Sequence, residues 1–200
     1  MTVETDVTRD SGAQHRRFLE IDGAFKRGDL EGLRAALEHP AAFPNDPLPL
    51  DVFGPAGTVL EYAIYHSPVS FIRALLEAGA NPCPEAHEHA GFPPLIAALS
   101  CTRTQPGSPA RADVSEILEL LVKFGADPSQ RGLNDWTALH MAVAERSLDA
   151  VRILLDAGAD PSLRTRIDDC DTPREMADAV GLQEIANMIR AAEEKRAGST

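Results

Sequence analysis

The sequence is short of cysteine and of aromatic residues. Three cysteines occur in 200 residues, and aromatic residues make up 5% of the chain. An odd and sparse set of cysteines does not build a disulfide framework. Few aromatics beside abundant alanine and leucine favour packed helices over a sheet sandwich. We therefore expect an all-α protein that works in a reducing compartment.

Positive charge and long apolar runs are also scarce. Nineteen Lys and Arg stand against 31 Asp and Glu, which gives a net charge of −12. Such a surface repels phosphate backbones and anionic lipids, so we expect neither nucleic acid nor membrane as a partner. No apolar run has the length of a membrane span, and residues 1–17 show no secretory signal. These absences predict a cytoplasmic protein. We also expect it to be monomeric when free.

A short motif recurs along the chain. Gly-Ala-Asn stands at 79–81, and Gly-Ala-Asp stands at 125–127 and again at 158–160. The last two copies are 33 residues apart, and the first two are 46 apart. The first interval is therefore 13 residues longer than the second. These extra residues lie in a Pro-, Gly- and Ser-rich insertion at 101–112 and in the loop before it. Without the excess the period is constant, which indicates a repeat fold.

Each repeat contains the same parts. A short apolar helix is expected over 137–145, with Thr137 as its N-cap, and a second helix over 148–157 has apolar residues at helical spacing. Gly158 should end that second helix because glycine adopts a positive φ without strain. Thr172 and Pro173 open the last repeat, since proline suits the first helical position. The units are thus helix pairs joined by extended loops.

This pattern resembles ankyrin repeats. The resemblance is carried by TALHMAV, VRILLDAGADPS, LEYAIYHSPVSFIRALLEAGANP and TPREMADAVGLQEI. It implies an all-α solenoid of five stacked helix-turn-helix units with extended loop tips and a capping repeat at each end. We predict one domain over 13–196, with repeats at 14–44, 56–84, 91–130, 135–164 and 170–196, the insertion at 101–112, and loose tails at 1–12 and 197–200.

Two junctions depart from the family pattern. Arg146 and Ser67 stand where the resemblance implies a glycine between the two helices, whereas Gly28 and Gly181 keep it. A left-handed backbone is unfavourable for residues other than glycine. We therefore expect strain at Arg146 and Ser67.

His140 is the obvious candidate for catalysis. It lies near Thr137 and several carboxylates, an arrangement that could suggest a base and a nucleophile. The resemblance instead implies that Thr137 and His140 make structural hydrogen bonds within and between repeats. The sequence contains no phosphate-binding loop, nucleophile elbow or HExxH motif. We therefore predict no catalytic residue and no enzymatic activity.

Two loops could be taken for metal sites. Cys83, His87 and His89 form a C-x3-H-x-H cluster, but a second pair of zinc ligands is missing. Asp168, Asp169 and Asp171 form an acidic run, but it lacks the Gly and Glu spacing of a calcium loop. We expect neither a metal nor a cofactor.

The resemblance also implies where a partner would bind. In ankyrin repeats the loop tips and the exposed positions of the first helices form a concave face that binds another protein. Exposed aromatics often anchor interfaces, and a gradient from basic to acidic residues steers association. On this pattern the candidate partner-binding residues are Lys26, Arg27, Tyr65, His66, His89, Phe92, Leu133, Asn134, Trp136, Glu145, Asp168, Asp169 and Asp171.

The sequence therefore predicts a protein-binding module that recognises one specific partner, as an adaptor, an inhibitor or a regulatory subunit. The alternative is an enzyme, or a sensor of a metal or small molecule, built on the ankyrin scaffold. The Cys83 loop and the acidic loop would be the sites of that alternative.

Overall fold

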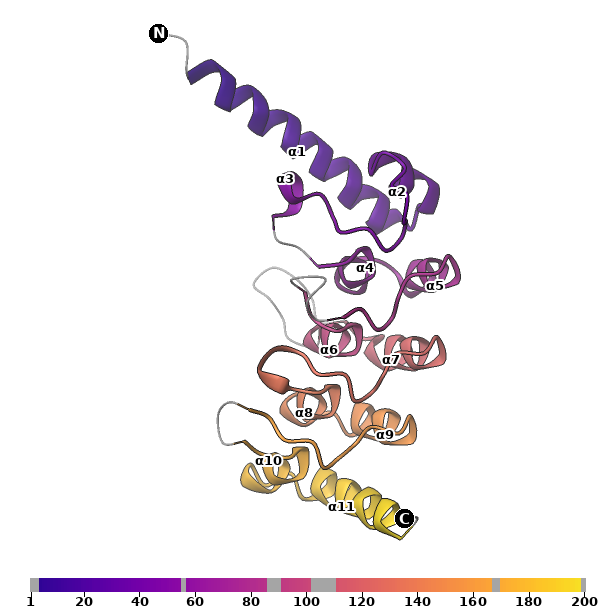
Figure 1. Ribbon diagram of the computed structural model, residues 1–200, viewed down its shortest axis with the longest axis vertical. Helices are drawn as coiled ribbons and strands as arrows, with labels where there is room; N and C mark the ends of the chain where they lie inside the picture. Colours follow the sequence, from indigo (N-terminus) through magenta and orange to yellow (C-terminus); the bar gives the residue numbers. More distant parts are fainter. Residues whose placement is uncertain (1–3, 55–56, 86–90, 102–110, 167–169, 199–200) are drawn as a thin grey trace. The chain divides into compact units, whose positions relative to one another are not determined.

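The computed structural model describes residues 4–54, 57–85, 91–101, 111–166 and 170–198 (Figure 1). Within these residues the regular structure is helical, which confirms the predicted all-α class. The elements are α1 (Glu4–Arg27), α2 (Leu30–Ala36), α3 (Leu50–Phe53), α4 (Val59–His66), α5 (Val69–Glu77), α6 (Pro94–Ser100), α7 (Val114–Lys123), the 3-10 helix η1 (Leu133–Asp135), α8 (Ala138–Ala144), α9 (Leu148–Asp156), α10 (Pro173–Ala179) and α11 (Gln183–Ala197).

The described residues form two compact units. The N-terminal unit contains residues 4–81 and Gly91, and the C-terminal unit contains residues 82–85 and 92–198. Helices α1 to α5 belong to the first unit, and helices α6 to α11 belong to the second. The single domain over 13–196 stays a prediction.

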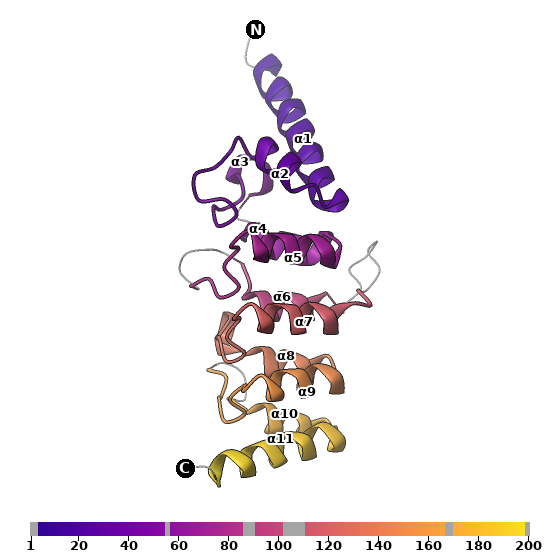
Figure 2. The same cartoon turned by 90° about the vertical axis from the view of Figure 1, so that its right-hand side faces the viewer.

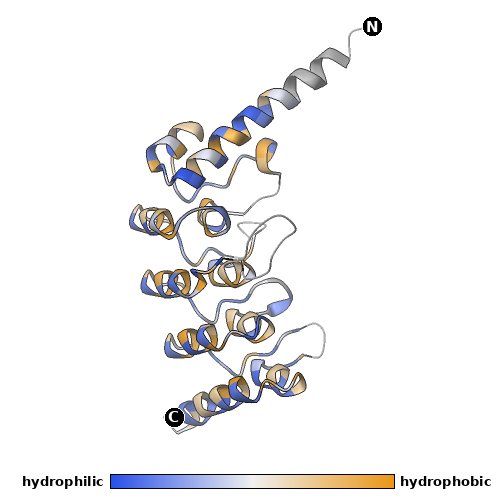
Figure 3. Ribbon diagram, turned by 180° about the vertical axis from the view of Figure 1, so that it is seen from behind, coloured by the Kyte–Doolittle hydropathy of each residue, from blue (hydrophilic) through white to orange (hydrophobic). Residues whose placement is uncertain are grey.

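The C-terminal unit stacks three helix pairs in two layers (Figure 2). In one layer α8 packs against α6 and α10, and in the other α9 packs against α7 and α11. Apolar and polar residues fall on separate sides of the helices (Figure 3). The apolar sides meet in a core that includes Leu118, Leu139 and Leu154, each fully buried. Burial of these side chains supplies most of the stacking energy.

The glycine turns end the second helices as predicted. Gly125 and Gly158 adopt φ values of 95° and 92°. The next residue then bonds back across the turn, from Ala159 N–H to the Leu154 carbonyl at 2.9 Å. This satisfies a carbonyl that the helix end would otherwise leave without a partner.

The entry to the last repeat is also confirmed. The Thr172 hydroxyl accepts the Glu175 N–H at 3.3 Å, and the Glu175 carboxylate accepts the Thr172 N–H at 2.8 Å. Pro173 fills the first turn, where its missing N–H costs nothing. These contacts form a complete capping box that fixes the start of α10.

The two unusual junctions differ from each other. Arg146 has a φ of 56°, close to that of Gly28 and Gly181, so the expected left-handed turn is present. Ser67 has a φ of −112° and a ψ of 157°, so the expected strain there is wrong. Pro68 explains the difference, because the residue before a proline is driven into extended backbone.

Replacing Arg146 by glycine should stabilise the protein. The left-handed backbone at Arg146 is unfavourable for a side chain, and the change should raise the free energy of unfolding by about 1 kcal/mol. Urea denaturation measures the change. Gly181→Ala is the converse control. It introduces a side chain at a φ of 72° and should lower the free energy of unfolding. A less stable Arg146→Gly variant would show that the arginine makes compensating contacts.

The N-terminal unit is built around a long first helix. Helix α1 packs against α2, α3 and α4, and buries Ile21, Ala24 and Phe25. It begins at Glu4, so most of the segment predicted as a loose tail over 1–12 is helical. The sequence permits this because no proline interrupts it and acidic residues near its start suit a helix N-terminus.

The irregular loop after α2 is tied to the next repeat. The Asn45 side chain accepts the Asn81 N–H at 2.7 Å and donates to the Gly79 carbonyl at 2.9 Å. A side chain of the C-terminal unit has the same role, since Ser129 Oγ accepts the Asp160 N–H at 2.9 Å. The loop of one repeat thereby holds the glycine turn of the following repeat.

Candidate partner-binding surface

His140 is a structural residue. It is fully buried, and its Nδ1 accepts the Thr137 backbone N–H at 3.1 Å and lies 2.9 Å from the Thr137 hydroxyl. Since Nδ1 accepts, the proton of the neutral ring lies on Nε2, which donates to the Asp171 carbonyl at 3.2 Å. The ring therefore joins α8 to the loop before α10, as the resemblance implied.

Burial keeps this imidazole neutral. The pKa of His140 lies below its ordinary value, mainly because burial disfavours the charged ring. Both ring nitrogens are engaged in bonds that position backbone. The arrangement leaves His140 a role in stability and gives no general base.

Two arginines hold the loop tips together. Arg131 donates to the Asp135 carbonyl at 3.3 Å and to the Arg164 carbonyl at 2.9 Å. Arg164, which stands 33 residues later, donates to the Cys170 carbonyl at 2.9 Å. Its guanidinium also binds both Glu175 carboxylate oxygens at 2.8 Å. Hydrogen bonds from Arg164, and after them those of Thr172, lower the pKa of Glu175 to about 2.

The tip beside α8 has an unusual backbone. Asn134 and Asp135 have φ values of 60° and 61°, and asparagine and aspartate tolerate this conformation better than most residues. The Asp135 carboxylate forms ion pairs with Arg131 and Arg166. These contacts hold the tip in place and leave the Asn134 side chain exposed.

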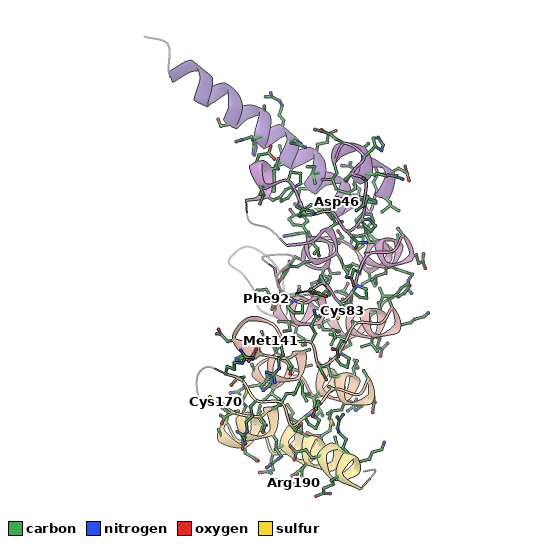
Figure 4. The ribbon with its side chains drawn as sticks, viewed as in Figure 1. Asp46, Cys83, Phe92, Met141, Cys170 and Arg190 are labelled. Carbon is green, nitrogen blue, oxygen red and sulfur yellow. The ribbon has the colours of Figure 1, made fainter. Side chains whose placement is uncertain are left out.

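The structure gives each predicted residue a different environment. In the C-terminal unit Phe92 is 40% exposed, while Trp136, Glu145 and Asp171 are half-buried. The Trp136 ring lies 6.0 Å from the His140 ring. Phe92 and Cys170 lie on the side of the loop tips (Figure 4).

In the N-terminal unit Arg27 and His66 are exposed and Tyr65 is half-buried. Lys26 is exposed, but its ammonium lies 2.7 Å from the Asp22 carboxylate. His89, Asp168 and Asp169 lie outside the described residues, and of Leu133 only the backbone is described. Because its basic and acidic ends belong to different units, the charge gradient stays a prediction.

A groove lies between α8 and α10 on the layer of first helices. Its volume is about 300 Å³. It is lined by Val143, Ala144, Arg146, Asp171, Met176, Ala179 and Val180. Apolar side chains dominate this lining, and Asp171 and Arg146 supply one charge of each sign. Val180 is 57% exposed, which is unusual for a large aliphatic side chain.

The sequence prediction missed Met176, Ala179 and Val180, because it selected only the loop residues Asp168, Asp169 and Asp171 for the last repeat. The sequence nevertheless contained a signal for Val180. Val180 precedes Gly181 as Glu145 precedes Arg146, so it occupies the junction position that was selected one repeat earlier. We call this α8/α10 groove, together with Trp136 and Glu145, the candidate partner-binding surface.

The metal alternative gains no support from the part of the chain that is described. There, no three His, Cys, Asp or Glu side chains gather as metal ligands. Cys83 is half-buried, while His87 and His89 are among the residues not described. Cys101 is buried, and burial raises the pKa of its thiol to about 11. A thiol with such a pKa is a poor ligand and nucleophile.

None of the described helices combines the length and the apolar character that crossing a membrane requires.

Known proteins share this pattern. A family described as ankyrin repeats (3 copies) matches residues 109–165. Protein phosphatase 1 regulatory subunit 27 of Mus musculus is 41% identical over 63 residues, which cover 32% of this chain and 40% of that protein. A putative ankyrin repeat-containing protein of Treponema pallidum is 41% identical over 51 residues, covering 26% of this chain and 17% of that protein.

A longer match of lower identity is to a protein named as an enzyme. Glycerophosphocholine phosphodiesterase gde1 of Schizosaccharomyces pombe is 32% identical over 132 residues, covering 66% of this chain and 11% of that protein. The chain spans less than half the length of each of these relatives.

Proposed function

Because the chain belongs to the ankyrin-repeat proteins, we propose that it recognises one specific partner protein through the candidate partner-binding surface. The observation that carries the proposal is the exposed Val180 beside the α8/α10 groove. A groove with an apolar floor and a few charged groups is typical of sites that bind a side chain of another protein. Trp136 precedes the N-cap of α8 and extends the surface toward the loop tip, whereas Glu145 is the C-cap at the other end of that helix.

The proposed role is regulatory. One relative is named a phosphatase regulatory subunit, and its matched segment covers 32% of this chain. The match to the phosphodiesterase covers only 11% of that enzyme, so it does not carry the enzyme's activity. We therefore propose an adaptor or regulatory subunit rather than a catalyst.

The N-terminal unit supplies a second set of proposed contacts. Lys26, Arg27, Tyr65 and His66 lie on α1 and α4, and three of them are exposed. We propose that they contact the same partner. The ammonium of Lys26 is paired with the largely buried Asp22 carboxylate, but the Lys26 side chain is itself 60% exposed and can still contact a partner.

The test is capture of the partner from the native host, followed by mass spectrometry. Trp136 is the chain's single tryptophan, so its fluorescence emission reports directly on this surface when a captured protein is added. Trp136→Ala should weaken binding by about 2 kcal/mol, or roughly 30-fold, if Trp136 anchors the interface.

Unfolding of the Trp136→Ala variant must be measured beside its affinity. An unchanged midpoint with weaker binding supports the proposal. Loss of folding would assign Trp136 to the core, and full binding by a folded variant would remove it from the interface.

A further inference from the structure

A second groove lies on the other layer of helices in the C-terminal unit, between α9 and α11. Its volume is about 670 Å³. Leu155, Ala159, Met188, Ala191 and Ala192 provide apolar contact area in it. Cavities of this size accept a short run of side chains.

The groove exists because α11 extends beyond the position at which its counterpart, α9, ends. Helix α9 is followed by Gly158, twelve residues after the junction residue Arg146. Glu193 stands at the same distance after Gly181, and α11 continues through it to Ala197. This continuation adds a wall beside the end of α9, while Ala191 and Ala192 are too small to fill the space.

The rim of the groove is cationic. Arg152, Lys195 and Arg196 line it together with a single carboxylate, that of Asp156. This local excess of positive charge contrasts with the net charge of −12 for the whole chain. At physiological ionic strength charges are screened beyond about 8 Å, so a bound segment responds mainly to this rim.

The cations have acidic neighbours on the protein. The Arg152 guanidinium lies 2.9 Å from Asp149, and the Arg196 guanidinium lies 3.4 Å from Asp160. Both arginine side chains are about half exposed, at 53%. The Asp149 side chain is 71% exposed and that of Asp160 is 29% exposed. The Arg152–Asp149 pair is therefore the weaker one, and carboxylates from a binding partner compete with Asp149 at little cost.

We propose that the α9/α11 groove binds an acidic protein segment with an apolar anchor. Its apolar side chain would contact Leu155 and Met188, and its carboxylates would face Arg152, Lys195 and Arg196. The apolar floor favours a peptide over a nucleic acid, whose sugar-phosphate backbone offers little for such a floor to bind. The site is separate from the α8/α10 groove and stands independently of its proposed role.

The experiment uses the full chain and a labelled synthetic peptide of about twelve residues, with leucines four positions apart and glutamate between them. Fluorescence anisotropy measures its affinity. Three further probes are a peptide with lysine in place of glutamate, a peptide with serine in place of leucine, and single-stranded oligothymidine of similar length. The acidic leucine peptide should saturate, and the other three should bind at least about tenfold more weakly.

Two variants locate the binding. Ala191→Phe fills the groove and Lys195→Glu reverses one rim charge, and each should weaken peptide binding about tenfold or more. Asn187→Phe, at an exposed site on the same helix, and Lys123→Glu, at the end of α7, are the matched controls and should bind as the parent does. Val180→Glu should also bind the peptide normally, which separates this site from the α8/α10 groove.

Several outcomes would overturn the proposal. These are the absence of saturable peptide binding, equal loss in the variants and their controls, or tighter binding of oligothymidine. Sedimentation of the chain alone is the remaining check. A dimer that Ala191→Phe dissociates would make the occupant a second copy of the chain and would equally reject an acidic partner segment.

Discussion

Replacing Val180 by glutamate should weaken partner binding about a hundredfold, or roughly 3 kcal/mol. Val180 is 57% exposed and lies at the end of α10, so the fold does not depend on its burial. A partner that covers the α8/α10 groove would take the new carboxylate out of water, and this desolvation is costly even near a cation such as Arg146. The affinity of the captured partner, measured by titration of the Trp136 emission, checks this result.

Leu50→Glu is the matched control for this variant. Leu50 is also an exposed aliphatic residue, at 71%, but it lies on α3 in the N-terminal unit. It should leave the affinity for the partner within about twofold of the parent, because isolated surface changes have small effects. Equal losses in both variants, or none in Val180→Glu, would exclude the α8/α10 groove as the binding site.

Replacing His140 by alanine should lower the free energy of unfolding by about 3 kcal/mol. The change opens a cavity in α8 and removes the acceptor of the Thr137 N–H and the donor to the Asp171 carbonyl. Urea denaturation at neutral pH measures the loss. His15→Ala, at an exposed site on α1, should stay within about 0.5 kcal/mol of the parent.

The contribution of His140 should also depend on pH. Its pKa in the folded state is lowered, mainly by burial, so the unfolded chain binds a proton more readily. Its stabilising effect is therefore complete above the unfolded pKa of about 6.5 and is lost as the pH falls through the folded pKa. The stability difference between the parent and His140→Ala should shrink below about pH 6. A difference that stays constant from neutral pH to pH 5 would mean that the folded and unfolded chains bind the proton equally, so that folding does not lower the pKa of His140.

Features governed by local chemistry could be predicted from the sequence. Gly158 ends α9 and Thr172 caps α10 because positive φ and an unsatisfied N–H demand particular residues. The predicted left-handed strain at Ser67 was wrong, because the neighbouring Pro68 drives that residue into extended backbone. Thus a periodic signal predicts the average repeat and misses departures from it that a neighbouring residue imposes.

The candidate surface was less predictable. Arg131 donates to a carbonyl of the following loop and Arg164 to a carbonyl of its own loop, and the sequence does not show which carbonyl a side chain will bind. The junction position of Val180 could be identified from the sequence, but its exposure depends on how α8 and α10 pack. Trp136 could be selected, because a bulky aromatic at a loop tip stands out from the pattern, but its contact with His140 required the structure.

The arginine ties of the loop tips have a consequence for lengthening the chain. Arg131 donates to a carbonyl 33 residues ahead, and the acceptor residue, Arg164, is itself a donor to Cys170 and Glu175 at the entry to the next helix pair. A segment such as 132–164 thus contains one acceptor for the repeat before it and one donor for the repeat after it. Tandem duplication of that segment would give every arginine donor a carbonyl acceptor. The loop edge of the C-terminal unit is therefore compatible with the addition of whole repeats.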